Sequence, residues 1–390
     1  MKRRQLLRTL AGGAGFALAQ SSFFPDVSFG AQQQALLNAV RLARSHHNVP
    51  ALAGAFIRGD TIEAIAATGL RVKEGTEPAT SEDTFHLGSC TKSMTATVMG
   101  QLVEEGLIDW DTELGDVLSV LDDSILDEYK PLTPDLLLSH RSGMTGIETP
   151  DSYNSFQTSL GFEFRTSEQL SKPLDEQRLA FSGRVLSRLP VTNPGSSHNY
   201  SNFNYIVAGA LIDSVTGQTW EEVIQERLFQ PLNMTSAGFG APGSPDSQSQ
   251  PWGHSTNACL PVAPGPDADN PVVYGPTGLV HANLNDWAQY AMLHLRGARG
   301  ESDLLLQPET FVKLQQDEFQ QNYSLGWVVA SQPWTNGPAL FHTGSNTFWM
   351  AVIWVVPGRN AAMLAVTNCG SDNAFPAVND VVISMIQQFL

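Results

Sequence analysis

The stretch Phe85-His86-Leu87-Gly88-Ser89-Cys90-Thr91-Lys92 decides how the rest of this chain is interpreted. It places a serine and a lysine three residues apart, and Lys92 is the only lysine with a serine at that spacing. Apolar residues then recur at Met94, Val98 and Leu102, which predicts a helix that begins near Ser89. Because residues i and i+3 share one face of a helix, we expect the amine of Lys92 to approach the hydroxyl of Ser89.

This pairing is the chemistry of an activated nucleophile. A serine hydroxyl attacks well only when a neighbouring base takes its proton. A lysine ordinarily keeps its proton up to about pH 10.4, so it assists only where an apolar pocket lowers its pKa. The alternative is that Ser89 caps the helix and Lys92 is a solvated residue of the first turn, which is the commoner meaning of a lone S-x-x-K pattern.

The composition excludes several partners. The chain has 390 residues, of which 42% are apolar and 16% charged, and its formal net charge is −17. Nucleic acids and anionic membrane surfaces are bound by clustered Lys and Arg, and no basic run follows the first few residues. We therefore expect neither as a partner. The length suits one enzyme body with an insertion.

Residues 1–30 are expected to be an export signal. Lys2-Arg3-Arg4 precedes a weakly apolar run from Leu10 to Ala19, an arrangement typical of twin-arginine signals. Ala17-Leu18-Ala19 matches an A-x-A cleavage site, and Ser28-Phe29-Gly30-Ala31 is a second candidate. The alternative is an amphipathic helix that stays on the protein. An export signal predicts a periplasmic or extracellular protein. The apolar run is too short to cross a bilayer, so we expect no stable membrane span.

The cysteine count is odd, with Cys90, Cys259 and Cys369. An odd count in an exported protein leaves at least one thiol free. Cys90 has no C-x-x-C partner, and we interpret it as a small buried packing residue. Cys259 and Cys369 could form one disulfide, which their spacing alone leaves open.

Strand patterns gather at the two ends of the chain. Apolar runs over 51–58 and 61–68 flank Gly59-Asp60 and predict a hairpin. Further strands are expected over 324–330, 349–356 and 363–367, before a helix over 378–390.

The middle of the chain has helical periodicity over 203–215 and 220–229. It is polar and aromatic without a clear period over 150–175, and irregular over 238–270. The sequence therefore predicts an α/β (α+β) fold, with α/β parts at about 31–92 and 271–390 and a helical insertion at about 93–270.

Two further short patterns follow the Ser89 segment. Tyr200-Ser201-Asn202 is the only Y-x-N in the chain and lies in a turn-rich loop that opens a helix. Such loops present side chains to a cleft. His342-Thr343-Gly344-Ser345 precedes the strand expected over 349–356, and its glycine lets a ligand approach the strand edge closely.

With S-x-x-K, Y-x-N and H-T-G in this order, the chain resembles the penicillin-recognising serine hydrolases. These are the class C β-lactamases, the D-alanyl-D-alanine carboxypeptidases, and related esterases and D-aminopeptidases. The resemblance covers roughly residues 35–390, and the stretches 138–144, 228–234 and 275–279 are also similar to the family. It implies the β-lactamase/transpeptidase-like fold, in which an antiparallel sheet flanked by helices carries an inserted all-α domain and the cleft lies between them.

The resemblance also implies a role for each motif residue. Ser89 would be the acylating nucleophile, Lys92 would assist its deprotonation, and Tyr200 would be the general base that later protonates the leaving group. The backbone N–H groups of Ser89 and Ser345 would form the oxyanion hole, and no metal or organic cofactor would be required. The substrate-binding residues would be Asn202, His342, Thr343, Gly344 and Ser345.

One residue departs from the lactamase pattern. Efficient class C β-lactamases carry a lysine where this chain has His342, and that cation helps to hold the carboxylate of the substrate. A histidine titrates near pH 6.5, so it is only partly charged at neutral pH. Some D,D-peptidases and esterases of the family resemble this chain in having H-T-G, so the change weighs against β-lactamase activity more than against hydrolysis.

Three other functions are weighed against this interpretation. The sequence does not support a metalloenzyme, because none of the nine histidines belongs to an H-E-x-x-H motif. His46-His47 lies at a predicted helix end, where histidines interact favourably with the helix dipole. An α/β-hydrolase needs G-x-S-x-G, which is absent. A non-enzymatic binder of penicillin or cell-wall fragments would need slow deacylation.

We therefore expect a serine hydrolase that acts on an amide or ester through an acyl-enzyme on Ser89. The expected activity is D,D-peptidase- or esterase-like, with a class C-like β-lactamase or a slowly deacylating binding protein as the alternatives. The substrate would be a small molecule or a peptide. Segments 145–180 and 240–275 would shape its pocket, and neither the substrate nor the oligomeric state is determined by these patterns.

Overall fold

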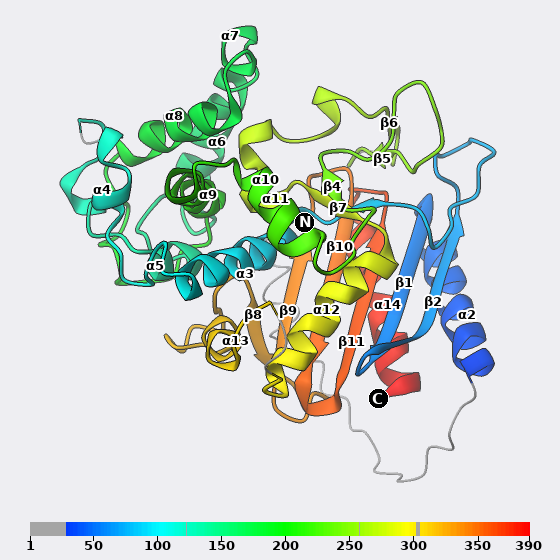
Figure 1. The fold of residues 1–390 in the computed structure, drawn as a ribbon. Coiled ribbons are helices and arrows are strands. Elements are labelled where there is room, and N and C mark those ends of the chain that lie inside the picture. Colours follow the sequence, from blue (N-terminus) through cyan, green and yellow to red (C-terminus); the bar gives the residue numbers. More distant parts are fainter. Residues whose placement is uncertain (1–28, 122, 257, 302–304) are drawn as a thin grey trace.

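The main sheet has six antiparallel strands in the order β2-β1-β11-β10-β9-β8 (Figure 1). The computed structural model describes residues 29–121, 123–256, 258–301 and 305–390, so the predicted export signal lies almost entirely outside the described residues. The strands are β1 (Ala51–Arg58), β2 (Thr61–Gly69), β8 (Val328–Ser331), β9 (Pro338–Gly344), β10 (Met350–Val356) and β11 (Ala361–Thr367).

Strand β1 is buried on both faces. Ala55 and Ile57 face one apolar cluster, whereas Leu52 and Phe56 face another. Successive side chains of a strand point to opposite faces, so a strand covered on both sides is apolar throughout. The predicted hairpin is confirmed: β1 pairs with β2 across a turn at Gly59, whose φ is +58°.

Helices cover both faces of this sheet (Figure 1). On one face α2 (Phe29–His47) and α14 (Ala374–Phe389) pack together over the strands, and α12 (Leu284–Ala298) lies on the other face. Helix α14 begins four residues before the predicted position 378. Pro376 lies in its first turn, where the missing N–H breaks no intrahelical bond. None of the described helices is both long and apolar enough to cross a bilayer.

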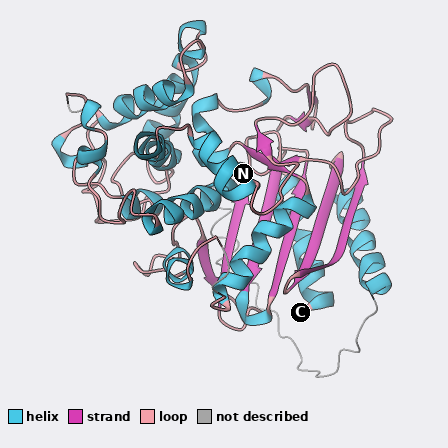
Figure 2. Cartoon of the chain, in the orientation of Figure 1, coloured by secondary structure: helices cyan, strands magenta, loops and turns pink. Residues whose placement is uncertain are grey.

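The middle of the chain forms a helical part beside the sheet (Figures 1 and 2). Helix α3 (Thr91–Glu104) lies between the two, and twelve of its residues are buried. The other helices of this part are α4 (Leu114–Val117), α5 (Pro134–Leu138), α6 (Pro150–Glu163), α7 (Ser167–Leu170), α8 (Leu174–Leu186), α9 (Asn202–Thr216) and α10 (Trp220–Ile224).

Several segments differ from the sequence-based expectation. No strand was expected over 338–344, where β9 carries His342–Gly344, and the strand expected over 324–330 is the shorter β8. The stretch 150–175, which showed no clear period, forms α6, α7 and the start of α8. Only Tyr153 and Leu160 of α6 are buried, so this helix has no apolar stripe to reveal it. The stretch 238–270, expected to be irregular, contains three two-residue strands: β4 (Gly238–Phe239), β5 (Gly253–His254) and β6 (Pro261–Val262).

A small second sheet places the start of the Ser89 segment. It consists of β3 (Phe85–His86), β7 (Val280–Ala282) and β4, in the order β3-β7-β4. The N–H of Leu87 then donates to the carbonyl of Val280 at 2.8 Å. Strand β7 follows the short helix α11 (Gly275–Gly278), so residues near 85 and near 278 are held together.

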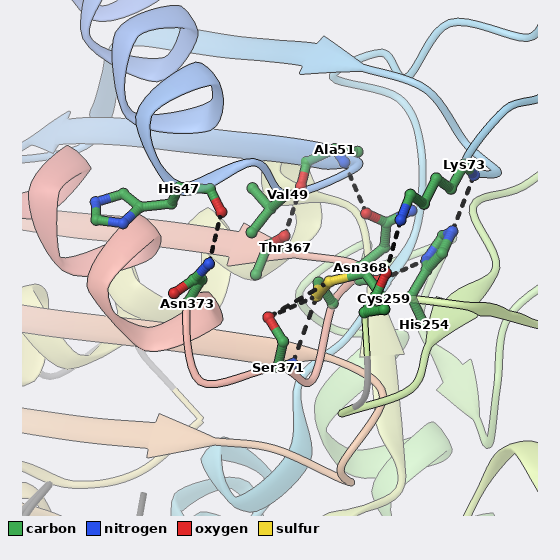
Figure 3. The surroundings of a disulfide bond; sticks show 12 residues. His47, Val49, Ala51, Lys73, His254, Cys259, Thr367, Asn368, Ser371 and Asn373 are labelled. Atoms are coloured by element: carbon green, nitrogen blue, oxygen red, sulfur yellow. Dashed lines mark hydrogen bonds between the residues drawn. A yellow bond between two sulfur atoms is a disulfide. The ribbon is translucent and has the colours of Figure 1, made fainter.

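Cys259 and Cys369 form a disulfide, with 5.8 Å between their Cα atoms (Figure 3). The bond joins the segment after β5 to the end of β11. Cys90 is a buried free thiol, as expected for a packing residue, and burial raises its pKa.

Candidate active site

The nucleophile candidate lies on a tight turn between β3 and α3. Gly88 has a φ of +51° and comes directly before Ser89. A Cβ atom at Gly88 would lie 2.3 Å from the backbone nitrogen of Ser345, so only glycine fits there. Gly88–Cys90 form a 3-10 turn that leads into α3. The helix thus begins close to Ser89, as its sequence predicts, and the Ser89 side chain is mostly buried.

Lys92 is oriented by three oxygen atoms. Its Nζ lies 3.0 Å from Ser89 Oγ, 2.9 Å from Asn202 Oδ1 and 2.7 Å from the Thr277 carbonyl. The side chain is fully buried. An ammonium group has three N–H donors, so these contacts fix the amine against the serine. The solvated first-turn alternative for Lys92 is therefore wrong.

Asn202 begins α9 and is oriented by two donors. Its Oδ1 accepts from Lys92 Nζ and also from Thr277 Oγ1, at 3.1 Å. Two donors on one oxygen fix which end of the amide faces Lys92, so the Nδ2 donors are directed away from the lysine. Thr277 was not predicted as a site residue. Its only signal was the family-like stretch 275–279.

Tyr200 lies over the lysine. The Lys92 amine is 5.1 Å from the centre of the Tyr200 ring, which is a cation–π distance. The ring also packs against His140, with 4.3 Å between centroids, and lies 6.3 Å from the ring of His342. Tyr200 is 7% exposed, so its environment is largely dry.

His342 occupies the same cluster of rings from the side of β9. Its Nε2 lies 3.4 Å from the hydroxyl of Tyr323, and its Nδ1 donates to the carbonyl of Thr343 at 2.6 Å. Tyr323 belongs to no motif, so sequence reasoning missed it. His140 is fully buried, and its Nδ1 accepts from the N–H of Ser201 at 3.3 Å. This contact gives His140 a structural role at the start of α9.

The end of β9 lies against the nucleophile turn. A Cβ atom at Gly344 would lie 1.9 Å from the Leu87 carbonyl oxygen and 2.7 Å from the Ser89 nitrogen. The backbones of Ser89 and Ser345 are therefore adjacent, as an oxyanion hole made by their two N–H groups requires. Strand β8 pairs with β9 only as far as Phe341, so the following residues of β9 form an edge.

Behind this turn lies a buried contact between His86 and Asp269. His86 Nδ1 accepts from the N–H of Gly88 at 3.1 Å, and its Nε2 lies 2.8 Å from Asp269 Oδ2. Asp269 Oδ1 accepts from Asn346 Nδ2 at 3.0 Å. These three side chains connect the nucleophile turn to the residue that follows Ser345.

The structure thus brings together all eight residues that the sequence nominated. Ser89 and Lys92 come from the turn and helix α3 between the two parts, Tyr200 and Asn202 from the start of α9, and His342, Thr343, Gly344 and Ser345 from one end of β9. Elsewhere, His46, His47 and Asp380 lie close enough to share a metal ion. His46 and His47 end α2 and Asp380 lies within α14, and none of the eight site residues is among them.

The antiparallel sheet with a helical part beside it is the fold of the penicillin-recognising serine hydrolases. The buried lysine in contact with a serine is the matching site. The Beta-lactamase family model matches residues 33–385, and the chain belongs to this family. A penicillin-binding protein 4 from Amycolatopsis lactamdurans is 26% identical over 344 residues, which cover 85% of this chain and 84% of that protein. A lovastatin esterase from Penicillium rubens is 30% identical over 178 residues, covering 42% of this chain and 41% of that protein.

Solved structures share the fold. A penicillin-binding protein homologue from Pyrococcus abyssi, which is octameric, has a TM-score of 0.70 at 20% identity, and the match covers 91% of this chain and 77% of that chain. A D-stereospecific amidohydrolase from Streptomyces sp. has a TM-score of 0.67 at 22% identity, covering 90% of this chain and 98% of that chain.

Proposed function

We propose that this protein is a serine hydrolase that cleaves an ester or amide through an acyl-enzyme on Ser89. The observation that carries the proposal is the 3.0 Å contact between Lys92 Nζ and Ser89 Oγ, made by a fully buried amine. Because this contact is within hydrogen-bond distance and closed to water, the amine can exchange a proton with the serine hydroxyl, which is what activation of a serine needs.

The first half of the reaction forms the acyl-enzyme. Ser89 Oγ attacks the carbonyl carbon while its proton passes to the group formed by Lys92 and Tyr200. The N–H groups of Ser89 and Ser345 donate to the developing oxyanion, and each such donor contributes about 3 kcal/mol. The proton then goes to the leaving group, whose alcohol or amine departs. We assign this transfer to Tyr200 from the family's Y-x-N pattern, and its ring lies over the Lys92 amine, with 5.1 Å between Nζ and the ring centre.

The second half releases the acid. Water attacks the Ser89 ester with the same groups acting as base, and the serine proton is restored. Asn202 holds the substrate, since its Oδ1 is occupied by Lys92 and Thr277 while its Nδ2 donors are directed away from them. If this second half is slow, the protein behaves as a covalent binder.

The substrate class we propose is an ester or a D-amino-acid peptide. The similarity to a lovastatin esterase and to a penicillin-binding protein supports both. A class C-like β-lactamase is the second candidate, supported by a Beta-lactamase of Escherichia coli that is 22% identical over 280 residues. His342 in the H-T-G triplet weighs against it, because the family's efficient lactamases use a lysine there.

Intact-protein mass spectrometry tests the nucleophile. The wild type is mixed with benzylpenicillin and, separately, with p-nitrophenyl acetate, beside Ser89→Ala and a control, Ser93→Ala. Ser93 lies one turn further along α3, and its Oγ donates to the Cys90 carbonyl at 3.0 Å. We expect adducts or turnover in the wild type and in Ser93→Ala, and neither in Ser89→Ala. Wild-type turnover by Ser89→Ala would contradict the proposal.

The fate of the drug separates the candidate activities. A stable penicillin adduct supports a penicillin-binding peptidase with slow deacylation. Penicillin consumed without an adduct supports a β-lactamase. Intact penicillin together with ester turnover supports an esterase.

We also propose that the protein is exported. The Lys2-Arg3-Arg4 start and a disulfide between Cys259 and Cys369 support this, since disulfides persist in oxidising compartments. Expression of the full chain with cell fractionation tests it. We expect a shortened N-terminus in the exported fraction of the wild type and retention when Arg3 and Arg4 are both changed to lysine. An intact N-terminus in the cytoplasmic fraction would contradict the proposal.

A further inference from the structure

Two histidines and an aspartate meet where the first and last helices of the described chain pack together. His46 and His47 are the last two residues of α2, and Asp380 lies within α14. Each side chain offers one ligand atom, a ring nitrogen or a carboxylate oxygen, and the three atoms all lie within 4.8 Å of one another. The proposed hydrolase reaction uses none of these side chains.

His47 and Asp380 are close to the spacing of two ligands on one ion. His47 Nε2 lies 2.7 Å from Asp380 Oδ2. Bonds from zinc to a histidine nitrogen or a carboxylate oxygen are about 2.0–2.2 Å long, which places two tetrahedral ligand atoms about 3.4 Å apart. A small separation of these two groups therefore admits an ion between them.

His46 supplies the third ligand atom, and its side chain can turn to do so. Its ring is stacked on the ring of His47, with 4.6 Å between centroids and 4° between planes. The nitrogen lone pairs of two parallel rings cannot both point to one ion, so one ring has to turn. His46 is exposed, whereas the His47 side chain is 14% exposed and its carbonyl accepts from Asn373 Nδ2 at 3.2 Å (Figure 3). The turn therefore falls on His46.

The surroundings of the three side chains favour a cation. The last carbonyls of a helix lack partners and give its C-terminus a partial negative charge, and both histidines lie at that end of α2. Asp380 adds a carboxylate. The arginine of the same turn, Arg44, is engaged with the carbonyls of Val49 and Pro50, at 3.4 Å each.

The ligand atoms select the class of metal. Imidazole nitrogens suit Zn²⁺, Cu²⁺ and Ni²⁺, whereas Mg²⁺ and Ca²⁺ prefer oxygen ligands throughout. Two histidines and one carboxylate leave the fourth position of a tetrahedral zinc ion to water.

We propose that His46, His47 and Asp380 bind a divalent metal ion that prefers nitrogen ligands, such as Zn²⁺, and that this ion clips the end of α2 to α14. His47 and Asp380 are 333 positions apart in the chain. A metal clip that closes so long a loop stabilises the folded chain against a costly loss of entropy. The role of the site is stability, and it does not depend on the proposed hydrolase function.

Calorimetric titration with ZnCl₂ tests the site, on protein that carries no histidine tag and has been treated with EDTA and dialysed. We expect the wild type to bind one Zn²⁺ and MgCl₂ to give no binding heat. Loss of one ligand, in His46→Ala or in Asp380→Asn, is expected to weaken zinc binding more than tenfold. The matched controls are Ser45→Ala, in the same turn of α2, and Asp111→Asn, at an exposed position of the helical part.

The controls and the wild type are expected to bind zinc equally, and circular dichroism verifies that each variant is folded. Zinc binding that survives unchanged in both ligand variants would overturn the inference. The absence of zinc binding by the wild type would overturn it as well.

Thermal unfolding gives an independent measurement. An ion that binds only the folded chain raises the melting temperature as its concentration rises above its Kd. We expect ZnCl₂ to raise the melting temperature of the wild type and of both controls by a few degrees, EDTA to reverse the shift, and neither ligand variant to respond. An equal shift in the ligand variants would contradict the site. Zinc binding in a wild type that hydrolyses no ester would contradict the proposed function alone.

Discussion

His86 Nε2 lies 2.8 Å from Asp269 Oδ2, and this buried contact connects the nucleophile turn to the loop before α11. The same histidine accepts the N–H of Gly88, and the same aspartate accepts from the side chain of Asn346. Each of these neighbours adjoins one of the two N–H groups assigned to the oxyanion hole, those of Ser89 and Ser345. The pair therefore supports the residues next to both donors.

Replacing His86 by alanine is expected to lower kcat with little change in KM. The reason is that a small displacement of an oxyanion donor costs up to about a hundredfold in rate, while the surface that binds substrate is unchanged. Steady-state kinetics with a p-nitrophenyl ester measure the split. A rise in KM as large as the fall in kcat would instead indicate a general structural role. So would a fall in kcat that a smaller folded fraction, measured by circular dichroism, explains.

Replacing Lys92 by methionine is expected to reduce the turnover rate about a thousandfold or more without lowering the melting temperature. The change removes the cost of burying an amine, which offsets the loss of its hydrogen bonds to three oxygen atoms. Lys92→Arg is the matched variant. It keeps the charge but holds its proton, so it is expected to be inactive too. Activity in either variant would argue against the amine as a proton-transfer group.

Replacing Gly344 by alanine is expected to remove activity and destabilise the protein. The added Cβ would lie 1.9 Å from the Leu87 carbonyl oxygen, so the backbone of β9 or of the nucleophile turn must move. Gly161→Ala is the control, because nothing lies within 4 Å of a Cβ at that position of α6. Urea unfolding and ester hydrolysis should both show a loss in Gly344→Ala and none in Gly161→Ala. Equal stability and activity of the two variants would contradict the close approach of Gly344 to the nucleophile turn.

Stability is expected to fall as the pH drops from about 6.5 towards 4. Burial lowers the pKa of His254 to about 4 and that of His294 to about 3. A histidine in the unfolded chain titrates near 6.5, so between these values the unfolded state binds more protons. The free energy of unfolding is therefore highest above pH 6.5, where both histidines are neutral in either state. It falls with the pH, by about 1.4 kcal/mol for each unit by which the pKa of a buried histidine is lowered.

His254 offers a direct test of this pH effect. Its Nδ1 donates to the Asn368 carbonyl at 2.6 Å, and its Nε2 accepts from the N–H of Lys73 at 2.9 Å (Figure 3). Protonation would turn that acceptor into a donor. Urea unfolding of the wild type and of His254→Gln at pH 7 and pH 5 measures the change. A wild-type stability that is flat over this range would contradict the prediction.

Removal of the disulfide is expected to cost about 2–4 kcal/mol of unfolding free energy, since the bond closes a loop with a sequence separation of 110. The double variant Cys259→Ser and Cys369→Ser should show this loss in urea unfolding. Dithiothreitol should destabilise the wild type and leave the double variant unchanged. An equal effect of the reductant on both proteins would contradict the assignment.

Much of the site was predictable because its signals are local. The spacing of Ser89 and Lys92 on one helix face already predicts their contact, which is 3.0 Å in the structure. The hairpin at Gly59 and the buried role of Cys90 follow in the same way from short-range patterns. Helix α6 escaped prediction because only Tyr153 and Leu160 are buried, so its sequence carries no apolar period.

The sequence by itself determined the order of the motifs, the helix after Ser89 and all the strands at the two chain ends except β9, because these depend on spacing within a few residues. Only the tertiary structure decided that Thr277 orients Lys92, that Tyr323 contacts His342, and that Asp269 supports the nucleophile turn. Each of these contacts joins residues far apart in the chain. Their distances are set by how the sheet and the helical part pack, and no local pattern records that packing.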